Sequence, residues 1–514
     1  MLAVAASATL LGLDAHTVRV EVQAERNVPY FELVGMAEAA VRESRVRVKS
    51  ALAQVGVDLS ECRVVVNLAP ADLRKSGSAF DLAIACATLA ALGKVPRHAL
   101  DGLLFLGELS LSGALHSIRG VLPYLLAARD VTQVILPAGN ELEASLVRKL
   151  DVRIAENLGD VLRHLNGTTR LPRAESREAT SPSASDLQDD FEEVRGQAGA
   201  RRAMEIAAAG MHHMLMVGPP GAGKTMLARR LGTILPSMEE YEALEVAAVH
   251  SVAGLLATSR QGLLGKRPFR APHHTLSDAA LVGGSDPPRP GEISLTHHGV
   301  LFLDELPEFK RSTLEVLRQP LEDGQVTISR AQSKAHFPAR PLLICAMNPC
   351  PCGYDGAPSR VCSCSEERKR AYRSRISGPL LDRLDLHVVL PAVDLVSLRS
   401  GKRGEPSSAI RERVERARAI QTARFSEGTV TARVNGQLSG TELEKVAALD
   451  DQGEALLARA VSSMALSARA YTKVLRLART IADLGQEAQV QAAHVAEAIA
   501  FRVFDRGGIT SRAA

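Results

Sequence analysis

The sequence has 514 residues, of which 46% are hydrophobic and 3% aromatic, and its formal net charge is +4. This length predicts two or three domains with sizeable cores. The near-neutral charge excludes a generally basic surface, so any nucleic-acid site must be local, and the scarcity of aromatic residues argues against platforms for base stacking.

Residues 1–15 are apolar but carry no cationic segment, which favours a β-strand over a signal peptide. The longest apolar run, Leu82–Leu92, is too short to cross a bilayer. Seven cysteines without a signal sequence suggest reduced thiols. We therefore expect a cytoplasmic protein with no membrane partner.

Residues 1–165 are predicted to form one α/β domain. Alternating apolar residues indicate strands, and apolar residues at helical spacing indicate helices. Strands are expected at 18–24, 63–68 and 134–136, and helices at 37–55 and 79–92. This stretch resembles the proteolytic domain of Lon and the related ChlI-type domain, through the segments KSGSA (75–79), GELSLSG (107–113), IRGV (118–121), LLAA (125–128) and VILP (134–137).

Lon-type proteases use a serine nucleophile and a lysine base, and the resemblance places Ala79 and Tyr124 at those two positions. Alanine has no nucleophile, and tyrosine is a poor base at neutral pH. The resemblance therefore implies a protease fold without a catalytic dyad. A shifted alignment would bring Ser76 or Ser78 into the nucleophile position, but residues 118–128 contain no lysine.

Residues 166–190 are rich in Ser, Thr, Pro and charged residues, which is typical of a linker. An apolar run then leads into GPPGAGKT, which fits the phosphate-loop pattern G-x-x-x-x-G-K-[ST] without a mismatch. Glycines let backbone N–H groups turn towards phosphates, and the helix that follows aims its positive end at the same anion. The predicted ATP-binding residues are Gly218, Pro219, Pro220, Gly221, Ala222, Gly223, Lys224 and Thr225.

The segment GVLFLDE (299–305) supports this interpretation. Four apolar residues predict a buried parallel strand, and Asp304 and Glu305 follow at the end where α/β sheets place ligands. Lys224 would bind the β- and γ-phosphates, while Thr225 and Asp304 would hold Mg²⁺. Glu305 would polarise the attacking water. The sequence thus predicts an ATPase, or at least an ATP-binding protein.

Two segments after a predicted helix at 312–321 match features of AAA+ proteins. Residues 325–330 and 334–337 flank a short polar turn, as in a β-hairpin, with Arg330 and Lys334 near its tip. This hairpin resembles the pore hairpin of the AAA+ branch that holds magnesium-chelatase motors and MCM helicases, where it would contact DNA; a solvated surface hairpin is the alternative. Asn348 ends the next buried strand and matches the sensor-1 position, which orients water.

Cys350, Cys352, Cys362 and Cys364 form a dense group in the insert 350–364. Four cysteines can bind zinc tetrahedrally, although C-x-C is a rarer spacing than C-x-x-C. Redox-active or free thiols are the alternatives. The histidine pairs 273–274 and 297–298 lack neighbours at metal-ligand spacing, so we expect them to be structural.

The C-terminal part contains two candidate arginines for the ATP site. The segment GPLLDRLD (378–385) resembles an arginine-finger segment, in which Arg383 would enter the neighbouring subunit's site; a surface ion pair is the alternative. Residues 467–478 resemble a sensor-2 helix with Arg469 at the reporting position, and Arg476 is a rival on the same face. An Arg-rich helix at 407–424 is expected to be a solvated face, and its residues 411–418 are a second candidate for DNA contact.

The whole sequence resembles the magnesium-chelatase-like AAA+ ATPases of the ComM/YifB family. The motifs are the Lon-like front, RAPHHT (270–275), PGEISL (290–295), NPCPC (348–352) and GPLLDRLD (378–385). The resemblance implies an AAA+ core at 191–400, a helical lid at 401–514, and a homo-hexameric ring that uses ATP and Mg²⁺.

The same resemblance implies a helicase that acts on single-stranded or branched DNA and promotes branch migration in recombination or natural transformation. A magnesium-chelatase motor for porphyrin metal insertion is the alternative, although it should not need the Lon-like front or the cysteines. An ATP-dependent protease is a third reading, which the missing Ser–Lys pair argues against.

Overall fold

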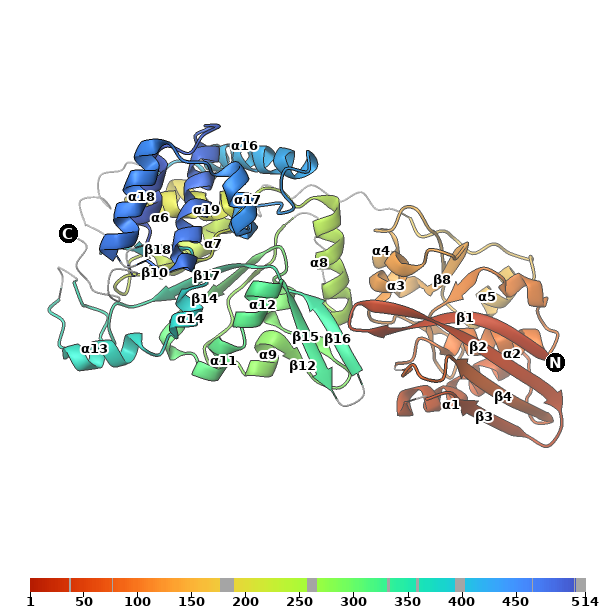
Figure 1. Ribbon diagram of the computed structural model, residues 1–514. Coiled ribbons are helices and arrows are strands. Elements are labelled where there is room, and N and C mark those ends of the chain that lie inside the picture. Colours follow the sequence, from red (N-terminus) through yellow and green to blue (C-terminus); the bar gives the residue numbers. More distant parts are fainter. Residues whose placement is uncertain are drawn as a thin grey trace.

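The computed structural model describes residues 1–36, 38–75, 77–175, 189–256, 266–330, 333–356, 360–392, 403–464, 466–502 and 504. Two α/β bodies lie side by side, each built on its own sheet, and the C-terminal helices pack on the second body (Figure 1). Most of the predicted linker, residues 176–188, lies outside the described part of the chain.

The N-terminal body is a seven-stranded mixed sheet with helices. Its strands lie in the order β3 (Tyr30–Val34), β4 (Cys62–Ala69), β2 (Asp14–Arg26), β1 (Leu2–Leu11), β5 (Leu103–Phe105), β8 (Gln133–Pro137) and β9 (Asp151–Ala155). β2 is antiparallel to both β1 and β4, and the remaining pairs are parallel. The main helices are α1 (Ala39–Gln54), α2 (Asp81–Ala91), α3 (Val121–Ala127) and α5 (Leu158–Leu165). The strand predicted within the apolar residues 1–15 is confirmed as β1.

The second body is a five-stranded parallel sheet. The order is β11 (Phe269–Arg270), β14 (Val300–Leu303), β17 (Leu342–Met347), β10 (Met214–Val217) and β18 (Leu386–Val389). Every residue of β10, β14 and β17 is buried, as expected for strands covered on both faces. Helices α6 (Ala198–Gly210) and α7 (Lys224–Ile234) flank β10 in sequence. The carboxyl ends of these parallel strands meet at one edge, which positions the site described below.

The helix predicted at 312–321 is wrong as a single element. The chain instead forms two short helices, α11 (Arg311–Glu315) and α12 (Arg318–Asp323). The ring of Pro320 would clash with the carbonyl of Val316, four residues earlier, and the helix breaks at that point. The predicted hairpin is confirmed as β15 (Gln325–Arg330) and β16 (Ser333–Pro338), with Ser329 opposite Lys334.

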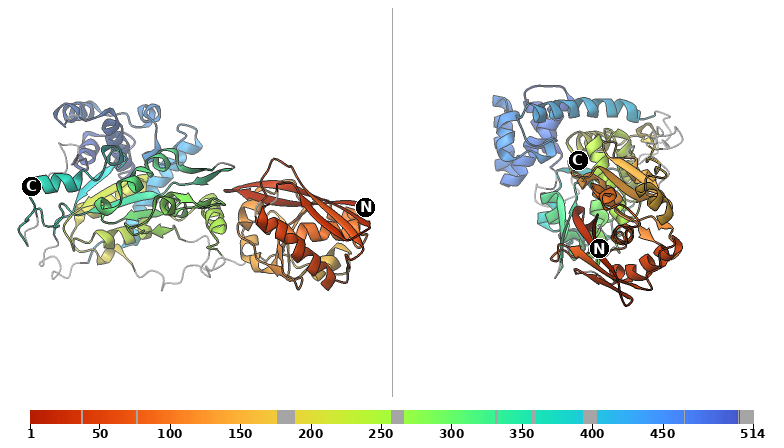
Figure 2. Two further views of the ribbon diagram at one scale, coloured as in Figure 1. Left: turned by 90° about the horizontal axis from the view of Figure 1, so that it is seen from below. Right: turned by 90° about the vertical axis from the view of Figure 1, so that its right-hand side faces the viewer.

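The helical lid predicted at 401–514 is a bundle whose α-helices, in the part that the structure describes, are α16 (Ser407–Ser426), α17 (Gly440–Val446), α18 (Asp451–Met464), α19 (Ala468–Leu484) and α20 (Ala492–Ala500). They share one hydrophobic core with α6, α7 and the five-stranded sheet, and Figure 2 shows them stacked over that sheet. Among the described helices, none is both long and apolar enough to span a membrane.

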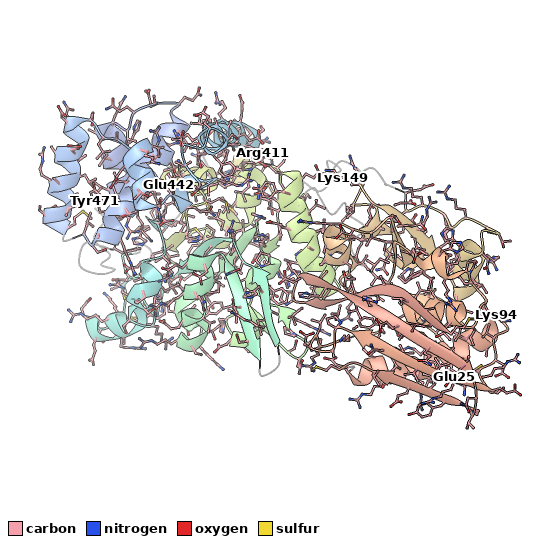
Figure 3. The ribbon with its side chains drawn as sticks, turned by 45° about the vertical axis from the view of Figure 1, so that its right-hand side comes forward. Glu25, Lys94, Lys149, Arg411, Glu442 and Tyr471 are labelled. Carbon is pink, nitrogen blue, oxygen red and sulfur yellow. The ribbon has the colours of Figure 1, made fainter. Side chains whose placement is uncertain are left out.

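Most arginines of α16 are not on the solvated face that the sequence suggested, although Arg416 is exposed. Arg411, labelled in Figure 3, donates to the carbonyl of Thr233 over 2.8 Å, and Arg418 donates to the carbonyl of Ala208 over 3.0 Å. Arg413 pairs with Glu405 and Glu205. These guanidiniums tie the bundle to the second body, which weakens the case for α16 as a DNA-contact element.

Several contacts between described residues join the two bodies. The Ser251 carbonyl, on α8 (Glu240–Ala253), accepts from the N–H of Gly120 over 3.2 Å, and Leu122 packs with Ala247 of the same helix. The turn between β1 and β2 reaches β16 of the hairpin (Figure 1), where a Cβ on Gly12 would lie 2.9 Å from the carbonyl oxygen of His336. Glycine is therefore required for this close approach.

Candidate active site

The phosphate loop connects β10 to α7 through two glycines with left-handed backbone. Gly221 has φ +78° and Gly223 has φ +87°, conformations that other residues rarely adopt. A Cβ on Gly218 would lie 2.8 Å from the carbonyl oxygen of Leu390, so this position also has no room for a side chain. The loop thus brings backbone N–H groups to the N-terminus of α7, an arrangement suited to phosphate.

Lys224 is held at the centre of the loop. Its ammonium donates to the carbonyls of Gly218 and Pro219, over 2.6 and 3.0 Å, and to Oδ1 of Asn348 over 3.1 Å. Burial lowers the pKa of Lys224, and the nearby carboxylates of Asp304 and Glu305 oppose that shift. A bound phosphate would add negative charge at this position and favour the protonated form.

Two oxygen groups suited to Mg²⁺ lie beside Lys224. The hydroxyl of Thr225 donates to Oδ2 of Asp304 over 2.7 Å, and Asp304 directly follows β14. Hydroxyl and carboxylate oxygens are the ligands that Mg²⁺ takes in nucleotide sites. These two oxygen groups therefore fit the Mg²⁺ that the sequence predicts. They lie together because β10 and β14 are both paired in parallel with β17, so that Thr225 and Asp304 follow strands that end at the same edge of the sheet.

Glu305 has a backbone conformation unusual for a non-glycine residue, with φ +52°. Such conformations cost about 1–3 kcal/mol and gather at functional sites. Its carboxylate is more than half exposed and lies 3.7 Å from Nδ1 of His274. The rings of His273 and His274 lie with their centroids 4.1 Å apart and their planes tilted by 34°. Sequence reasoning missed His274 as a neighbour of Glu305; the adjacent histidines in RAPHHT were the only available signal.

Arg383, Arg469 and Arg476 line one cleft of about 600 Å³ between the core and the bundle. Arg383 donates to the carbonyl of Arg318 over 3.0 Å and pairs with Glu322, while Arg469 is exposed and lies 3.9 Å from Asp382. Arg476 is largely buried and donates to the carbonyl of Leu438. Among the described residues that line this cleft, none belongs to the phosphate loop.

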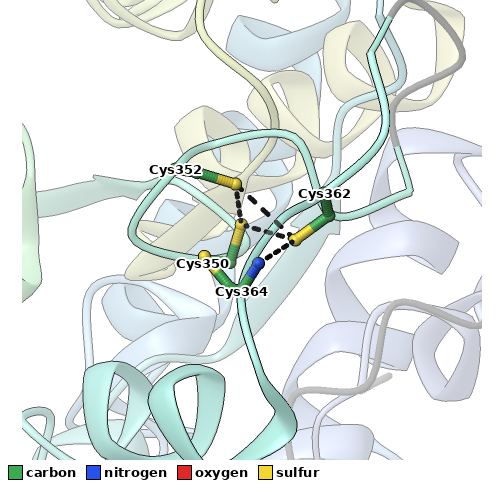
Figure 4. Close-up of side chains that lie close together, drawn as sticks. All are labelled: Cys350, Cys352, Cys362 and Cys364. Carbon is green, nitrogen blue, oxygen red and sulfur yellow. Dashed lines mark hydrogen bonds between the residues drawn. The ribbon is translucent and has the colours of Figure 1, made fainter.

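The four cysteines that follow Asn348 converge in space (Figure 4). The Sγ–Sγ distances are 3.3 Å for Cys350–Cys352 and 3.6 Å from each of these to Cys362. All four sulfurs lie within 4.8 Å of one another. A backbone hydrogen bond from Tyr354 lowers the pKa of Cys352 to about 6, whereas burial raises the pKa of each of the other three thiols.

Comparisons with known proteins agree with this geometry. Family models match residues 190–398 (magnesium chelatase, subunit ChlI), 20–140 (subunit ChlI of Mg-chelatase) and 404–502 (magnesium chelatase, subunit ChlI C-terminal). The chain is 43% identical over 512 residues to competence protein ComM of Haemophilus influenzae, and 40% identical over 509 residues to protein YifB of Salmonella typhimurium; 98% of each chain is covered. The chain belongs to the ComM/YifB family of magnesium-chelatase-like AAA+ ATPases.

This ComM/YifB family member is also similar over part of its length to a Lon protease. Over 146 residues the chain is 26% identical to Lon protease 2 of Bacillus subtilis, which covers 27% of this chain and 26% of that protein. Ala79 and Tyr124 lie in one buried apolar cluster, and burial raises the pKa of Tyr124. The form that could accept a proton is the phenolate, and a raised pKa leaves even less of it at neutral pH. Ser78 donates to Glu108, and Ser76 lies outside the described residues.

The hairpin that the sequence analysis expected to line a pore is only partly described. Val326, Ile328, Ala335 and Phe337 bury one face of β15 and β16 against the core, and the Lys334 side chain is exposed. The side chain of Arg330 and residues 331–332 lie outside the described part.

His297 and His298 contact Glu245, with Nε2–Oε2 distances of 2.9 and 2.8 Å. These groups are close enough to suggest a metal site. However, Nδ1 of His297 accepts from the N–H of Arg340 over 3.1 Å, so Nε2 carries the proton and donates to Glu245. This tautomer leaves no lone pair on Nε2 of His297 for a metal, which supports the structural role expected for His297.

Proposed function

We propose that this ATPase is a ring-forming DNA motor, and specifically a hexameric helicase that promotes branch migration in recombination or natural transformation. The observation that carries the proposal is the full-length match to competence protein ComM, since competence is the uptake of DNA by cells. Its cofactors would be ATP and Mg²⁺, with Zn²⁺ at the four cysteines, and its partners would be identical subunits and single-stranded or branched DNA.

Each residue of the proposed ATP site has a chemical role. Lys224 and the N–H groups of residues 218–225 would bind the phosphates, and Thr225 and Asp304 would hold Mg²⁺, which would supply positive charge beside the phosphates. Glu305 accepts a proton from the attacking water, and Asn348, fixed by its hydrogen bond with Lys224, orients that water.

The arginines of the cleft account for the proposed ring. Since Arg383 and Arg469 line a cleft without the phosphate loop of their own chain, they would complete the ATP site of a neighbouring subunit. Arg383 would leave Glu322 and stabilise charge on the transferring phosphoryl group. A monomer with full specific activity would contradict this arrangement.

The hairpin would hold DNA by charge. In a ring, copies of Arg330 and Lys334 would surround the pore, and cations that neutralise phosphates give salt-dependent, sequence-independent affinity. The contact between Gly12 and His336 braces β16 from the N-terminal body, which gives the Lon-like part a mechanical role in place of peptidase activity.

The test is the double variant Arg330→Ala/Lys334→Ala, with Lys94→Ala as the matched control because Lys94 is exposed on the N-terminal body (Figure 3). The double variant should bind single-stranded DNA more weakly, with a salt dependence shallower by about 0.7 per lost phosphate contact in log–log slope. Its ATPase activity without DNA should match that of the wild type. Branch migration at the wild-type rate by this variant would refute the hairpin as the element that binds DNA.

A magnesium-chelatase motor is the second candidate, favoured by the names of the matching family models. The two candidates differ in the expected stimulus. ATP hydrolysis by a DNA motor should rise with branched or single-stranded DNA, whereas a chelatase motor should respond to the porphyrin-binding subunits and remain indifferent to DNA.

A further inference from the structure

The four-cysteine group has the dimensions of a tetrahedral metal site. Zinc binds thiolate sulfur at about 2.3 Å, which places the sulfurs of a regular tetrahedron about 3.8 Å apart. In the structure, three Sγ–Sγ distances are 3.3–3.6 Å and all four sulfurs lie within 4.8 Å of one another, which is close to this edge length. A disulfide would need about 2.05 Å between the sulfurs, so no described pair is bonded.

The loop that carries the cysteines has almost no hydrophobic core. Cys350 and Gly353 are its buried members among the described residues of 350–365, and Val361 is 91% exposed. A segment of this kind needs another source of stability, and a bound metal is the usual one in small loops that lack a core.

Ion pairs fix the far end of the same loop to the helix that follows it. Helix α13 (Glu366–Arg373) begins two residues after Cys364. Its Lys369 and Arg373 reach back to Asp355, over 2.8 and 2.9 Å, and Arg373 also donates to the carbonyl of Pro349. The loop is thus closed at both ends around the sulfurs.

The near end of the loop touches the phosphate site directly. Asn348, which accepts from Lys224, stands two residues before Cys350. Gly353, one residue after Cys352, has φ +85° and packs so closely on Pro220 that an added Cβ would lie 2.7 Å from the proline ring. The cysteine loop therefore contacts the ATP site at the sensor side chain and at the phosphate loop.

From these observations we infer that Cys350, Cys352, Cys362 and Cys364 hold one Zn²⁺, and that this ion braces Asn348 and the phosphate loop for nucleotide binding. Metal occupancy would then set the affinity of the chain for ATP, so the zinc site would have a role beyond local folding. The inference rests on the proposed ATP site, but on no part of the proposed DNA activity.

Metal content is the first measurement. Protein purified under reducing, chelator-free conditions should contain one zinc per chain by elemental analysis, and Cys362→Ser should lose most of it. Cys62→Ser, which removes a thiol on β4 of the N-terminal body, is the matched control and should keep the zinc. Protein loaded with Co²⁺ should show the absorption bands of a tetrahedral thiolate site. Wild-type protein without bound zinc would overturn the inference.

Nucleotide affinity is the second measurement, made with a fluorescent ATP analogue so that neither hydrolysis nor DNA is needed. Zinc-free wild type and Cys362→Ser should bind the analogue at least about tenfold more weakly than the zinc-loaded protein, and added zinc should restore the wild type alone. Zinc removal that leaves the affinity unchanged would overturn the bracing role.

Gly353→Ala tests the contact between the cysteine loop and the phosphate loop without removing a cysteine, in case Cys362→Ser does not fold. This variant should keep its zinc and still bind the analogue more weakly, because its methyl group displaces Pro220. Full affinity in Gly353→Ala would also contradict the inference. A wild type that holds zinc, binds ATP and ignores DNA would instead refute the proposed motor and leave the zinc inference intact.

Discussion

A buried ion pair joins the C-terminal bundle to the ATPase core, next to the cleft that Arg383 and Arg469 line. Asp385 precedes β18, and its Oδ1 lies 3.2 Å from the ammonium of Lys473 on α19. Both side chains are less than a tenth exposed, and Oδ2 accepts from the N–H of His213 over 3.2 Å. Although burial alone would raise the pKa of Asp385, Lys473 and His212 hold it well below its usual range.

We predict that Asp385→Asn destabilises the joined core and bundle strongly, because the charge of Lys473 stays buried without its partner. Removal of one member of a buried pair costs about 3–5 kcal/mol. For a unit of this size each kcal/mol lowers the melting temperature by about 2–4 °C, so the expected decrease is about 6–20 °C. The carboxylate's contribution is complete at neutral pH and is lost only as acid protonates it, below the ordinary pKa of about 3.9.

Scanning calorimetry measures this shift, with Asp382→Asn as the matched control. Asp382 undergoes the same chemical change three residues away, but it is about half exposed and 3.9 Å from Arg469, and exposed pairs contribute about 0–1 kcal/mol. ATPase activity should also decrease in Asp385→Asn, because the ion pair positions Arg383 and Arg469. Equal melting temperatures for the two variants would refute the reasoning.

Three further predictions concern the ATP site and the N-terminal body. Glu305→Gln should bind ATP normally and lose about 10²–10⁴-fold in turnover because it cannot accept the water proton, as nucleotide binding and phosphate release assays would show; normal turnover would remove Glu305 from that role. Arg383→Ala should bind ATP without hydrolysing it, and mixing it with Lys224→Ala subunits should restore some activity, because each variant damages a different half of a shared site; mixtures with no recovered activity would contradict shared sites. The N-terminal body should cleave no unfolded protein substrate with or without ATP, and cleavage by a preparation free of contaminating proteases would show that the assignment of Tyr124 is wrong.

The local elements of the ATP site were predictable because each depends on short-range patterns. The phosphate loop requires glycine at fixed positions, and the buried strands before it and before Asp304 appear as continuous apolar runs. The single helix predicted at 312–321 failed because helical spacing of apolar residues outweighed the effect of Pro320. The prediction of a solvated face on α16 was wrong because the sequence does not distinguish an arginine that donates to a distant backbone carbonyl from one that is hydrated.

The sequence by itself determined the family, the phosphate loop, and the alternation of strands and helices, since these follow from residue types at fixed spacing. Only the tertiary structure decided which distant side chains meet. It placed His274 beside Glu305, Asp385 against Lys473, and the cysteine loop against Pro220. The physical reason is that such contacts depend on strand order and on how helices pack across the sheet, which join residues up to hundreds of positions apart.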